Sequence, residues 1–288
     1  MKVFEDRFWS SRDGLTLHFR DYPGPGGEGS RLPVLCLHGL TRNARDFDVL
    51  APRLAAGRRV ICPDLRGRGD SEYAKDSGTY NPAQYAEDVL ALIEQEKLDR
   101  FVVIGTSLGG LVAMSLATML PGRIAGAVIN DVGPSLEPTG LGRIKDYVGQ
   151  GRSWPTWVHA ARGLEDIQGR AHPNQPLDFW IGIAKRLMTV SGSGRIVFDY
   201  DMKVAEPIIA LDVEAQPDLW EAWDALARVP VLVVRGALSD LLSAETLAKM
   251  LSRAPGAEAL TLEGIGHAPT LDEPESVVAI MRLLDRAV

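Results

Sequence analysis

Short runs of consecutive apolar residues recur along the chain and alternate with longer stretches in which apolar residues return every three or four positions. Continuous Val, Ile, Leu and Ala runs are typical of parallel strands that helices cover on both faces. Their alternation with helical patterns indicates a doubly wound α/β fold with right-handed crossovers. We therefore predict a mostly parallel sheet with strands at Pro33–Leu37, Arg59–Ile61, Phe101–Gly105, Ile124–Asn130, Pro230–Arg235 and Ala257–Leu262, and helices at Ala44–Ala55, Pro82–Glu96, Leu108–Met119, Ala244–Ala254 and Glu275–Arg286.

The N-terminal pattern is different, because apolar and polar residues alternate there. Val3–Trp9 and Leu15–Arg20 show this period of two, which predicts an antiparallel hairpin at the edge of the sheet. A turn-rich stretch, Pro23–Ser30, follows. It contains the spacing G-x-G-x-x-G from Gly24 to Gly29, but a proline interrupts it and a strand comes next, so we expect no dinucleotide site.

The strand–helix alternation stops between about Gly133 and Ala227. This stretch shows helical patterns, no strong strand run and five of the six tryptophans. We interpret it as a helical lid inserted between the sixth and seventh strands of the main sheet. The expected organisation is a core domain in two parts, residues 1–132 and 228–288, with a lid at 133–227. The tryptophans either fill a second small core or line an apolar pocket.

Composition narrows the classes of protein and partner. The 288 residues carry 31 basic and 38 acidic side chains, a net charge of −7, which argues against a nucleic-acid surface. No apolar run is long enough to span a membrane. Cys36 and Cys62 cannot form a disulfide scaffold, so we expect reduced thiols and a cytoplasmic location. No P-loop or H-E-x-x-H spacing occurs, so we expect no cofactor and no metal. The expected partner is a small-molecule substrate.

A serine between glycines follows one of the predicted strands. Gly105-Thr-Ser107-Leu-Gly109 matches G-x-S-x-G, and a helical stretch begins at Leu108. Such a tight strand-to-helix turn presents the hydroxyl above the sheet, and its glycines let neighbouring backbone approach. The helix N-terminus favours developing negative charge. We therefore predict that Ser107 is a nucleophile.

A serine hydroxyl needs a base within hydrogen-bond distance. His267 follows the last predicted strand, in a glycine-containing loop that can carry the imidazole over the carboxyl edge of the sheet. The expected third member is a carboxylate that orients the imidazole. We predict Asp240, in the loop after Pro230–Arg235, because the order Ser107, Asp240, His267 is the one expected for this arrangement. The alternative is Asp131, directly after the strand Ile124–Asn130.

Two backbone N–H groups are the expected donors to an oxyanion. One belongs to Leu108, which follows the serine, and the other to Leu40 in the loop His38-Gly-Leu-Thr41. His38 is expected to support that loop. The candidate substrate-binding side chains are His38, Trp154, Trp157, His159 and Trp180.

Together these motifs resemble the α/β-hydrolase fold superfamily, in the branch with a helical lid after the sixth strand. The resemblance rests on His38-Gly39, Asp64–Ser71, Gly105–Gly109, Asn130–Pro134, Asp240 and Gly266-His267, in family order over nearly the whole chain. It implies that the Asp64–Ser71 loop is a structural turn. Dehalogenases and epoxide hydrolases of this fold carry aspartate where this chain has Ser107. The resemblance therefore argues against an intermediate in which the substrate is esterified to an aspartate of the enzyme.

The resulting prediction is a serine hydrolase that cleaves esters, lactones or related acyl substrates of small to medium size through an acyl-enzyme. Three alternatives stay open. The same triad serves hydrolysis of carbon–carbon bonds in ring-cleavage products and perhydrolysis without a cofactor. The third is a ligand-sensing protein that has lost catalysis.

Overall fold

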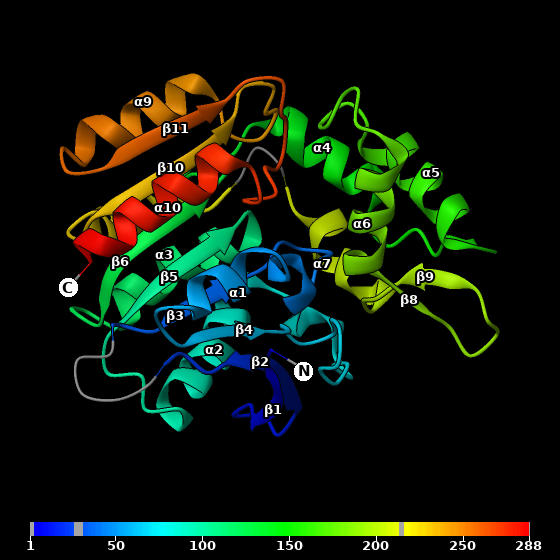
Figure 1. Cartoon of the computed structure of the whole chain (residues 1–288), viewed down its shortest axis with the longest axis horizontal. Helices are drawn as coiled ribbons and strands as arrows, with labels where there is room; N and C mark the ends of the chain where they lie inside the picture. The colour runs from blue at the N-terminus through cyan, green and yellow to red at the C-terminus, as the bar shows by residue number, and fades with distance from the viewer. Residues whose placement is uncertain (1–2, 26–30, 213–215, 288) are drawn as a thin grey trace.

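The structure is a computed structural model that describes residues 3–25, 31–212 and 216–287. Within these residues an eight-stranded sheet has the order β1-β2-β4-β3-β5-β6-β10-β11 (Figure 1). The hairpin β1–β2 and the pair β2–β4 are antiparallel, and the remaining pairs are parallel. The strands are β1 (Glu5–Ser10), β2 (Thr16–Tyr22), β3 (Val34–Leu37), β4 (Val60–Pro63), β5 (Phe101–Thr106), β6 (Ile124–Asn130), β10 (Val231–Gly236) and β11 (Glu258–Leu262).

Helices cover both faces of the sheet. Side chains of α2, α3, α8 and α9 pack into the larger core on one face, and α1 and α10 pack into the core on the other. The expected helix 44–55 is divided into the 3₁₀ turn η1 (Ala44–Phe47) and α1. The helices are α1 (Leu50–Ala55), α2 (Pro82–Gln95), α3 (Leu108–Met119), α8 (Trp220–Leu226), α9 (Ala244–Arg253) and α10 (Pro274–Arg286).

Both faces of the central strands are buried, which explains their continuous apolar runs. In β3, Leu35 and Leu37 belong to the core under α2 and α3, whereas Val34 and Cys36 belong to the core under α1 and α10. Cys36 of β3 and Cys62 of the adjacent strand β4 are buried free thiols. The doubly wound, mostly parallel sheet predicted from the sequence is therefore confirmed.

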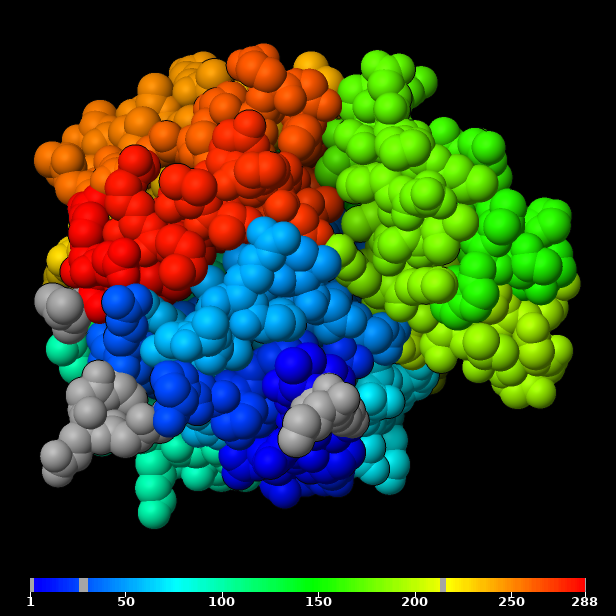
Figure 2. All heavy atoms as spheres, in the orientation of Figure 1, coloured from blue at the N-terminus to red at the C-terminus, as the bar shows by residue number. Residues whose placement is uncertain are grey.

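Between β6 and β10 the chain forms the lobe beside the sheet and then returns to the main core at α8; the part from α4 to α7 is called the insertion below (Figures 1 and 2). It is mainly helical, but it also contains a three-stranded antiparallel sheet, β7-β9-β8, that the sequence did not predict. These strands have only two or three residues, too few for a recognisable alternation. The elements are α4 (Pro138–Tyr147), β7 (Ser153–Trp154), α5 (Trp157–Gln168), α6 (Leu177–Leu187), β8 (Met188–Val190), β9 (Ile196–Phe198), η3 (Met202–Val204) and α7 (Ala205–Ala210).

The insertion has a small hydrophobic core of its own, built where α5 and α6 pack together. Trp180 lies at its centre with 1% of its surface exposed, and Trp154 and Trp157 pack around it. Helix α8 instead joins the main core, where Trp223 is fully buried beside α3. A lid role for residues 133–227 stays a prediction.

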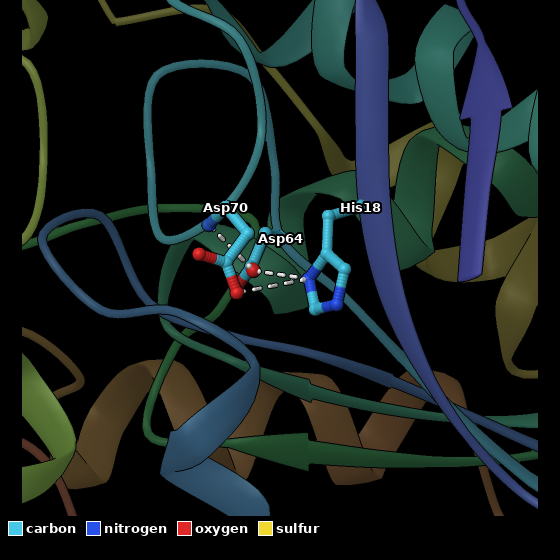
Figure 3. Close-up of side chains that lie close together, drawn as sticks. All are labelled: His18, Asp64 and Asp70. Carbon is cyan, nitrogen blue, oxygen red and sulfur yellow. Dashed lines mark hydrogen bonds and ion pairs between the residues drawn. The ribbon is translucent and has the colours of Figure 1, made fainter. Parts of the chain in front are cut away.

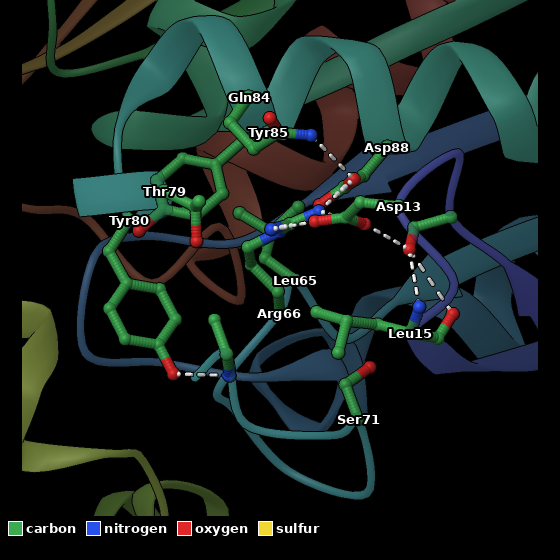
Figure 4. A network of polar contacts seen from close by, with 12 residues as sticks. Asp13, Leu15, Leu65, Arg66, Ser71, Thr79, Tyr80, Gln84, Tyr85 and Asp88 are labelled. Atoms are coloured by element: carbon green, nitrogen blue, oxygen red, sulfur yellow. Dashed lines mark hydrogen bonds and ion pairs between the residues drawn. The ribbon is translucent and has the colours of Figure 1, made fainter. Parts of the chain in front are cut away.

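A buried arginine joins the turn of the N-terminal hairpin to α2 (Figure 4). Arg66, in the loop after β4, is fully buried and donates to both carboxylate oxygens of Asp88 on α2 at 2.6 Å. It also donates to both oxygens of Asp13 in the β1–β2 turn at 2.9 Å. Four charge-assisted hydrogen bonds therefore join three chain segments at one guanidinium.

Candidate active site

Ser107 occupies the sharp turn between β5 and α3. Its backbone has φ 52° and ψ −115°, a conformation that is strained for a residue with a side chain. The flanking glycines are required by close backbone contacts. A Cβ on Gly105 would lie 2.4 Å from the carbonyl oxygen of Gly109, and one on Gly109 would lie 2.1 Å from that of Leu37. The G-x-S-x-G turn therefore forms the predicted strand–turn–helix geometry.

The structure brings Ser107 and His267 together from distant parts of the chain. The Ser107 Oγ lies 3.0 Å from the His267 Nε2. The loop of His267 is held by the insertion, because the Gly266 N–H donates to the Ala171 carbonyl at 2.6 Å. A Cβ on Gly266 would lie 2.9 Å from the Cα of Ala171, so glycine permits this contact.

The carboxylate on the far side of the imidazole belongs to Asp131. Its Oδ2 lies 2.8 Å from the His267 Nδ1 and also accepts from the Ser239 hydroxyl at 2.6 Å. Its Oδ1 accepts from the Gly236 N–H at 2.8 Å. Asp131 is fully buried, and these contacts hold its carboxylate in one orientation beside His267.

The expectation that Asp240 contacts His267 is wrong. Asp240 receives two hydrogen bonds from Arg143 of α4, at 2.5 and 2.7 Å. The chain turns after β10, where the Ser239 N–H donates to the Gly236 carbonyl, and this turn places Asp240 against α4. Burial acts to raise the pKa of Asp240, but the hydrogen bonds and charge of Arg143 outweigh it and the net pKa lies below its usual value.

The two predicted backbone donors lie beside the serine. Leu40 and Leu108 line the same cavity as Ser107, and Leu108 is the first residue of α3, so its N–H has no acceptor within the helix. His38 does not reach this cavity. It is fully buried, its Nδ1 lies 2.7 Å from the Gly39 carbonyl oxygen and its Nε2 accepts from the Leu65 N–H. Burial lowers the pKa of His38 to about 4, so the ring is neutral and supports the loop.

The other candidate substrate-binding residues lie away from Ser107. Trp154, Trp157 and Trp180 pack in the core of the insertion, and none lines a cavity that contains the serine. His159 is exposed, and its Nδ1 lies 2.8 Å from the Thr156 hydroxyl at the start of α5. Of the two interpretations left open by the sequence, the second small core is therefore correct for these tryptophans.

An apolar cavity of about 230 Å³ opens beside Ser107, between the sheet and the insertion. Its walls are mainly aliphatic, with Tyr80, Asn81 and Gln216 among the other lining residues. Core residues supply one wall, and α4 and α7 of the insertion supply the other. The lining includes Leu40, Leu108, Leu111, Val132, Leu136, Leu141, Ile144, Pro207, Ile208 and Leu241.

Two further pockets border His267, and they are called the polar pockets below because charged side chains line both of them. The first has a volume of only about 30 Å³ and is lined by Ser107, His267, Arg42 and Arg143. The second, of about 120 Å³, is lined by His267, Arg143, Asp240 and Arg170. The sequence does not single out Arg143, because one arginine in a helical pattern carries no local signal of its spatial neighbours.

One group of potential metal ligands occurs among the described residues, formed by His18, Asp64 and Asp70 (Figure 3). The Asp64 carboxylate is already occupied, since it accepts from the Ala44 and Asp70 N–H groups and lies 2.7 Å from the His18 Nδ1. A Cβ on Gly69 would overlap that carboxylate. These contacts make the Asp64–Ser71 loop a structural turn, as the resemblance implies.

The sheet order and the strand–turn–helix at Ser107 are those of the α/β-hydrolase fold. Residues 34–280 match the alpha/beta hydrolase family, and the chain belongs to it. Among the residues that the structure describes, no helix is both long and apolar enough to cross a membrane.

Several relatives and solved structures to which the chain is similar are named as hydrolases. The chain is 59% identical to an alpha/beta hydrolase from Novosphingobium aromaticivorans of known crystal structure. The two structures match over 99% of each chain with a TM-score of 0.94. It is 35% identical over 268 residues to a 3-hydroxybutyrate-oligomer hydrolase of Cupriavidus necator, covering 91% of each protein. It is also 28% identical to a 2-(acetamidomethylene)succinate hydrolase of Mesorhizobium japonicum, covering 98% of each. These comparisons support an enzyme of the hydrolase class.

Proposed function

We propose that the protein is a serine esterase that works through an acyl-enzyme, with Ser107 as nucleophile, His267 as base and Asp131 as the carboxylate that orients His267. The observation that carries this proposal is the continuous hydrogen-bonded chain from Ser107 through His267 to Asp131. The strained serine turn and the buried carboxylate supply the preorganisation that nucleophilic catalysis needs.

In this mechanism the Ser107 Oγ attacks the ester carbonyl carbon while the His267 Nε2 takes the hydroxyl proton. The N–H groups of Leu40 and Leu108 stabilise the oxyanion, and the loss of one such donor typically costs about 2.7–4 kcal/mol in the barrier. His267 then gives its proton to the leaving alcohol oxygen, and the carbon–oxygen bond breaks. Water, activated by the same imidazole, releases the carboxylic acid and restores the serine.

The two sides of Ser107 suit the two parts of an ester. The apolar cavity contains the serine and both proposed oxyanion donors but not His267, so it suits the acyl chain. The polar pockets contain His267, which must protonate the leaving oxygen, so they suit the alcohol. The Cupriavidus relative is named for an oligoester of a short hydroxy acid, and we propose short hydroxyacyl esters as the substrate class.

A fluorophosphonate probe with mass mapping of the labelled peptide tests this proposal. We expect a covalent adduct on Ser107 and its loss in Ser107→Ala. Ser115→Ala is the matched control, because Ser115 lies on α3 with its hydroxyl donating to the Leu111 carbonyl. Labelling of a different residue, or no labelling of folded protein, would contradict the mechanism and favour a ligand-sensing role.

A second assay separates ester cleavage from the other reactions that the same three residues could serve. We expect turnover of p-nitrophenyl butanoate that exceeds turnover of a vinylogous diketone acid, the model for carbon–carbon bond hydrolysis. Peroxide-dependent halide oxidation tests perhydrolysis. Faster cleavage of the diketone acid than of the ester would overturn the esterase proposal.

A further inference from the structure

Arg143 lines both polar pockets beside His267. Its side chain is 27% exposed, so the guanidinium lies in the wall of the site and not in bulk solvent. Arg42 lines the first of these pockets as well, and it is 16% exposed and paired with Asp46. The leaving-group side of Ser107 is therefore bordered by two partly buried guanidinium groups in a protein whose net charge is −7.

Asp240 fixes the orientation of Arg143. The pair is bidentate, since the Arg143 Nε and Nη2 each donate to one oxygen of Asp240. A guanidinium has five N–H donors, and this side-on pair uses two of them. Tyr147, which also lines the first pocket, interacts with the same guanidinium, and the N–H groups that remain can donate charge-assisted hydrogen bonds to a carboxylate.

We infer that Arg143 binds a carboxylate on the leaving alcohol, so that the preferred substrate is the ester of a hydroxy acid with a free carboxyl group. This inference rests on the proposed esterase function. His267 must lie next to the leaving oxygen, and Arg143 borders the same pockets, so the carboxylate lies within a few atoms of that oxygen. The enzyme then removes the terminal hydroxy acid from the carboxyl end of an oligoester, and Asp240 is the positioning residue for Arg143.

Carboxylate binding by Arg143 would give the two aspartates near His267 different roles: Asp131 orients His267, and Asp240 orients Arg143. Asp131 and Asp240 both lie near His267, but only Asp131 hydrogen-bonds to it. Asp240 instead spans from the loop after β10 to α4 of the insertion through Arg143. Its position joins the part of the protein that carries the catalytic residues to the part that borders the leaving group.

A matched pair of substrates tests the inference. The acid 3-(butanoyloxy)butanoate and its primary amide have the same shape and the same ester bond, but only the acid carries a negative charge. We expect the protein to prefer the acid in kcat/KM by about ten- to a hundredfold, mainly through KM, because charge-assisted hydrogen bonds are that strong. Equal values for acid and amide would overturn the inference.

Variants assign the preference to one side chain. Arg143→Gln is expected to bring the acid-to-amide ratio near 1, and Arg143→Lys to retain part of it because a point charge remains. Since Arg143→Gln leaves Asp240 without its partner, the double variant with Asp240→Asn is measured as well and should lose the ratio equally. Arg162→Gln, on the surface of α5, should keep it. Retention of the full ratio in Arg143→Gln and in the double variant would refute the role of Arg143.

The two proposals can fail separately. If p-nitrophenyl butanoate, the acid and the amide are all inert with folded protein, the esterase function fails. If the neutral esters are cleaved and the acid is not favoured, the esterase function stands and the carboxylate site fails.

Discussion

The imidazole of His267 is hydrogen-bonded to Asp131, 2.8 Å away, while Asp240 is turned toward Arg143. The carboxylate of Asp240 is thus paired with an arginine of α4. In other enzymes with this arrangement, replacing the orienting aspartate by asparagine lowers kcat by about 10⁴.

We therefore expect Asp131→Asn to reduce kcat for p-nitrophenyl butanoate by about 10⁴, because an uncharged amide neither fixes the imidazole in the required tautomer nor stabilises the imidazolium. Asp240→Asn should reduce kcat by no more than about tenfold, since it changes only the position of Arg143. Steady-state kinetics on both variants, with circular dichroism to confirm folding, measures the difference. The reverse order of the two effects would restore Asp240 as the catalytic carboxylate.

The sequence identified Ser107 and His267 through local patterns, because a strand, a tight turn and glycines mark them within a few residues. The choice between two aspartates depended on the path of a loop. Asp131 follows β6 directly, so its position is fixed by the strand. Asp240 lies four residues beyond Gly236, and only the turn through Ser239 decides where its side chain points.

The main sheet could be predicted from the sequence, whereas the small sheet of the insertion could not. Buried parallel strands require continuous apolar runs, as in β5 and β6, and these are visible in the sequence. Strands of two or three residues, such as β7 and β8, arise from pairing within the folded insertion and leave no periodic pattern. The sequence also could not show whether Trp180 packs in a core or lines a pocket. Both environments are apolar and suit tryptophan, so tertiary packing decides between them.

Arg66 and Arg12 both link the β1–β2 turn to α2, but replacing them should lower the free energy of unfolding by very different amounts. Arg66 is fully buried between Asp13 and Asp88, whereas Arg12 pairs with Glu87 at the surface, where its side chain is 54% exposed. Arg66→Met leaves a buried carboxylate unpaired and should lower the free energy of unfolding by about 3–5 kcal/mol. Arg12→Met should cost less than about 1 kcal/mol. Urea unfolding followed by circular dichroism compares them, and similar losses would contradict the assigned role of Arg66.

Two helical glycines should respond oppositely to alanine. A Cβ on Gly109 would lie 2.1 Å from the Leu37 carbonyl oxygen, so Gly109→Ala forces β3 and α3 apart and should destabilise the protein by about 3 kcal/mol or more. A Cβ on Gly182 of α6 would meet no atom within 4 Å, so Gly182→Ala should stabilise by up to about 1 kcal/mol. Thermal unfolding of both variants checks the signs, and a neutral Gly109→Ala would show that the turn tolerates a side chain.

His18 should make stability depend on pH. Burial acts to lower the pKa of His18, but hydrogen bonds and charge from Asp64, Asp6 and Asp70 outweigh it and the net pKa is raised. A raised pKa stabilises the fold below the unfolded value of about 6.5, and this contribution disappears as the pH rises through the folded pKa. The loss of unfolding free energy in His18→Gln should thus be larger near about pH 5.5 than near about pH 9. Urea titrations at both pH values measure it, with the exposed His159→Gln as control. An equal loss at both pH values would show that the charge of His18 adds nothing.

Two consecutive isoleucines on α7 test whether the apolar cavity holds the acyl chain. Ile208 lines the cavity beside Ser107, whereas Ile209 is 58% exposed on the outside of the helix. Ile208→Trp fills part of the cavity, so kcat/KM for p-nitrophenyl octanoate should fall by at least about tenfold relative to the acetate ester, because a pocket discriminates by the volume it leaves. Ile209→Trp adds the same side chain outside and should leave the octanoate-to-acetate ratio at its original value. If both variants keep that ratio, the acyl chain lies elsewhere, and the polar pockets beside His267 become the site for both halves of the ester.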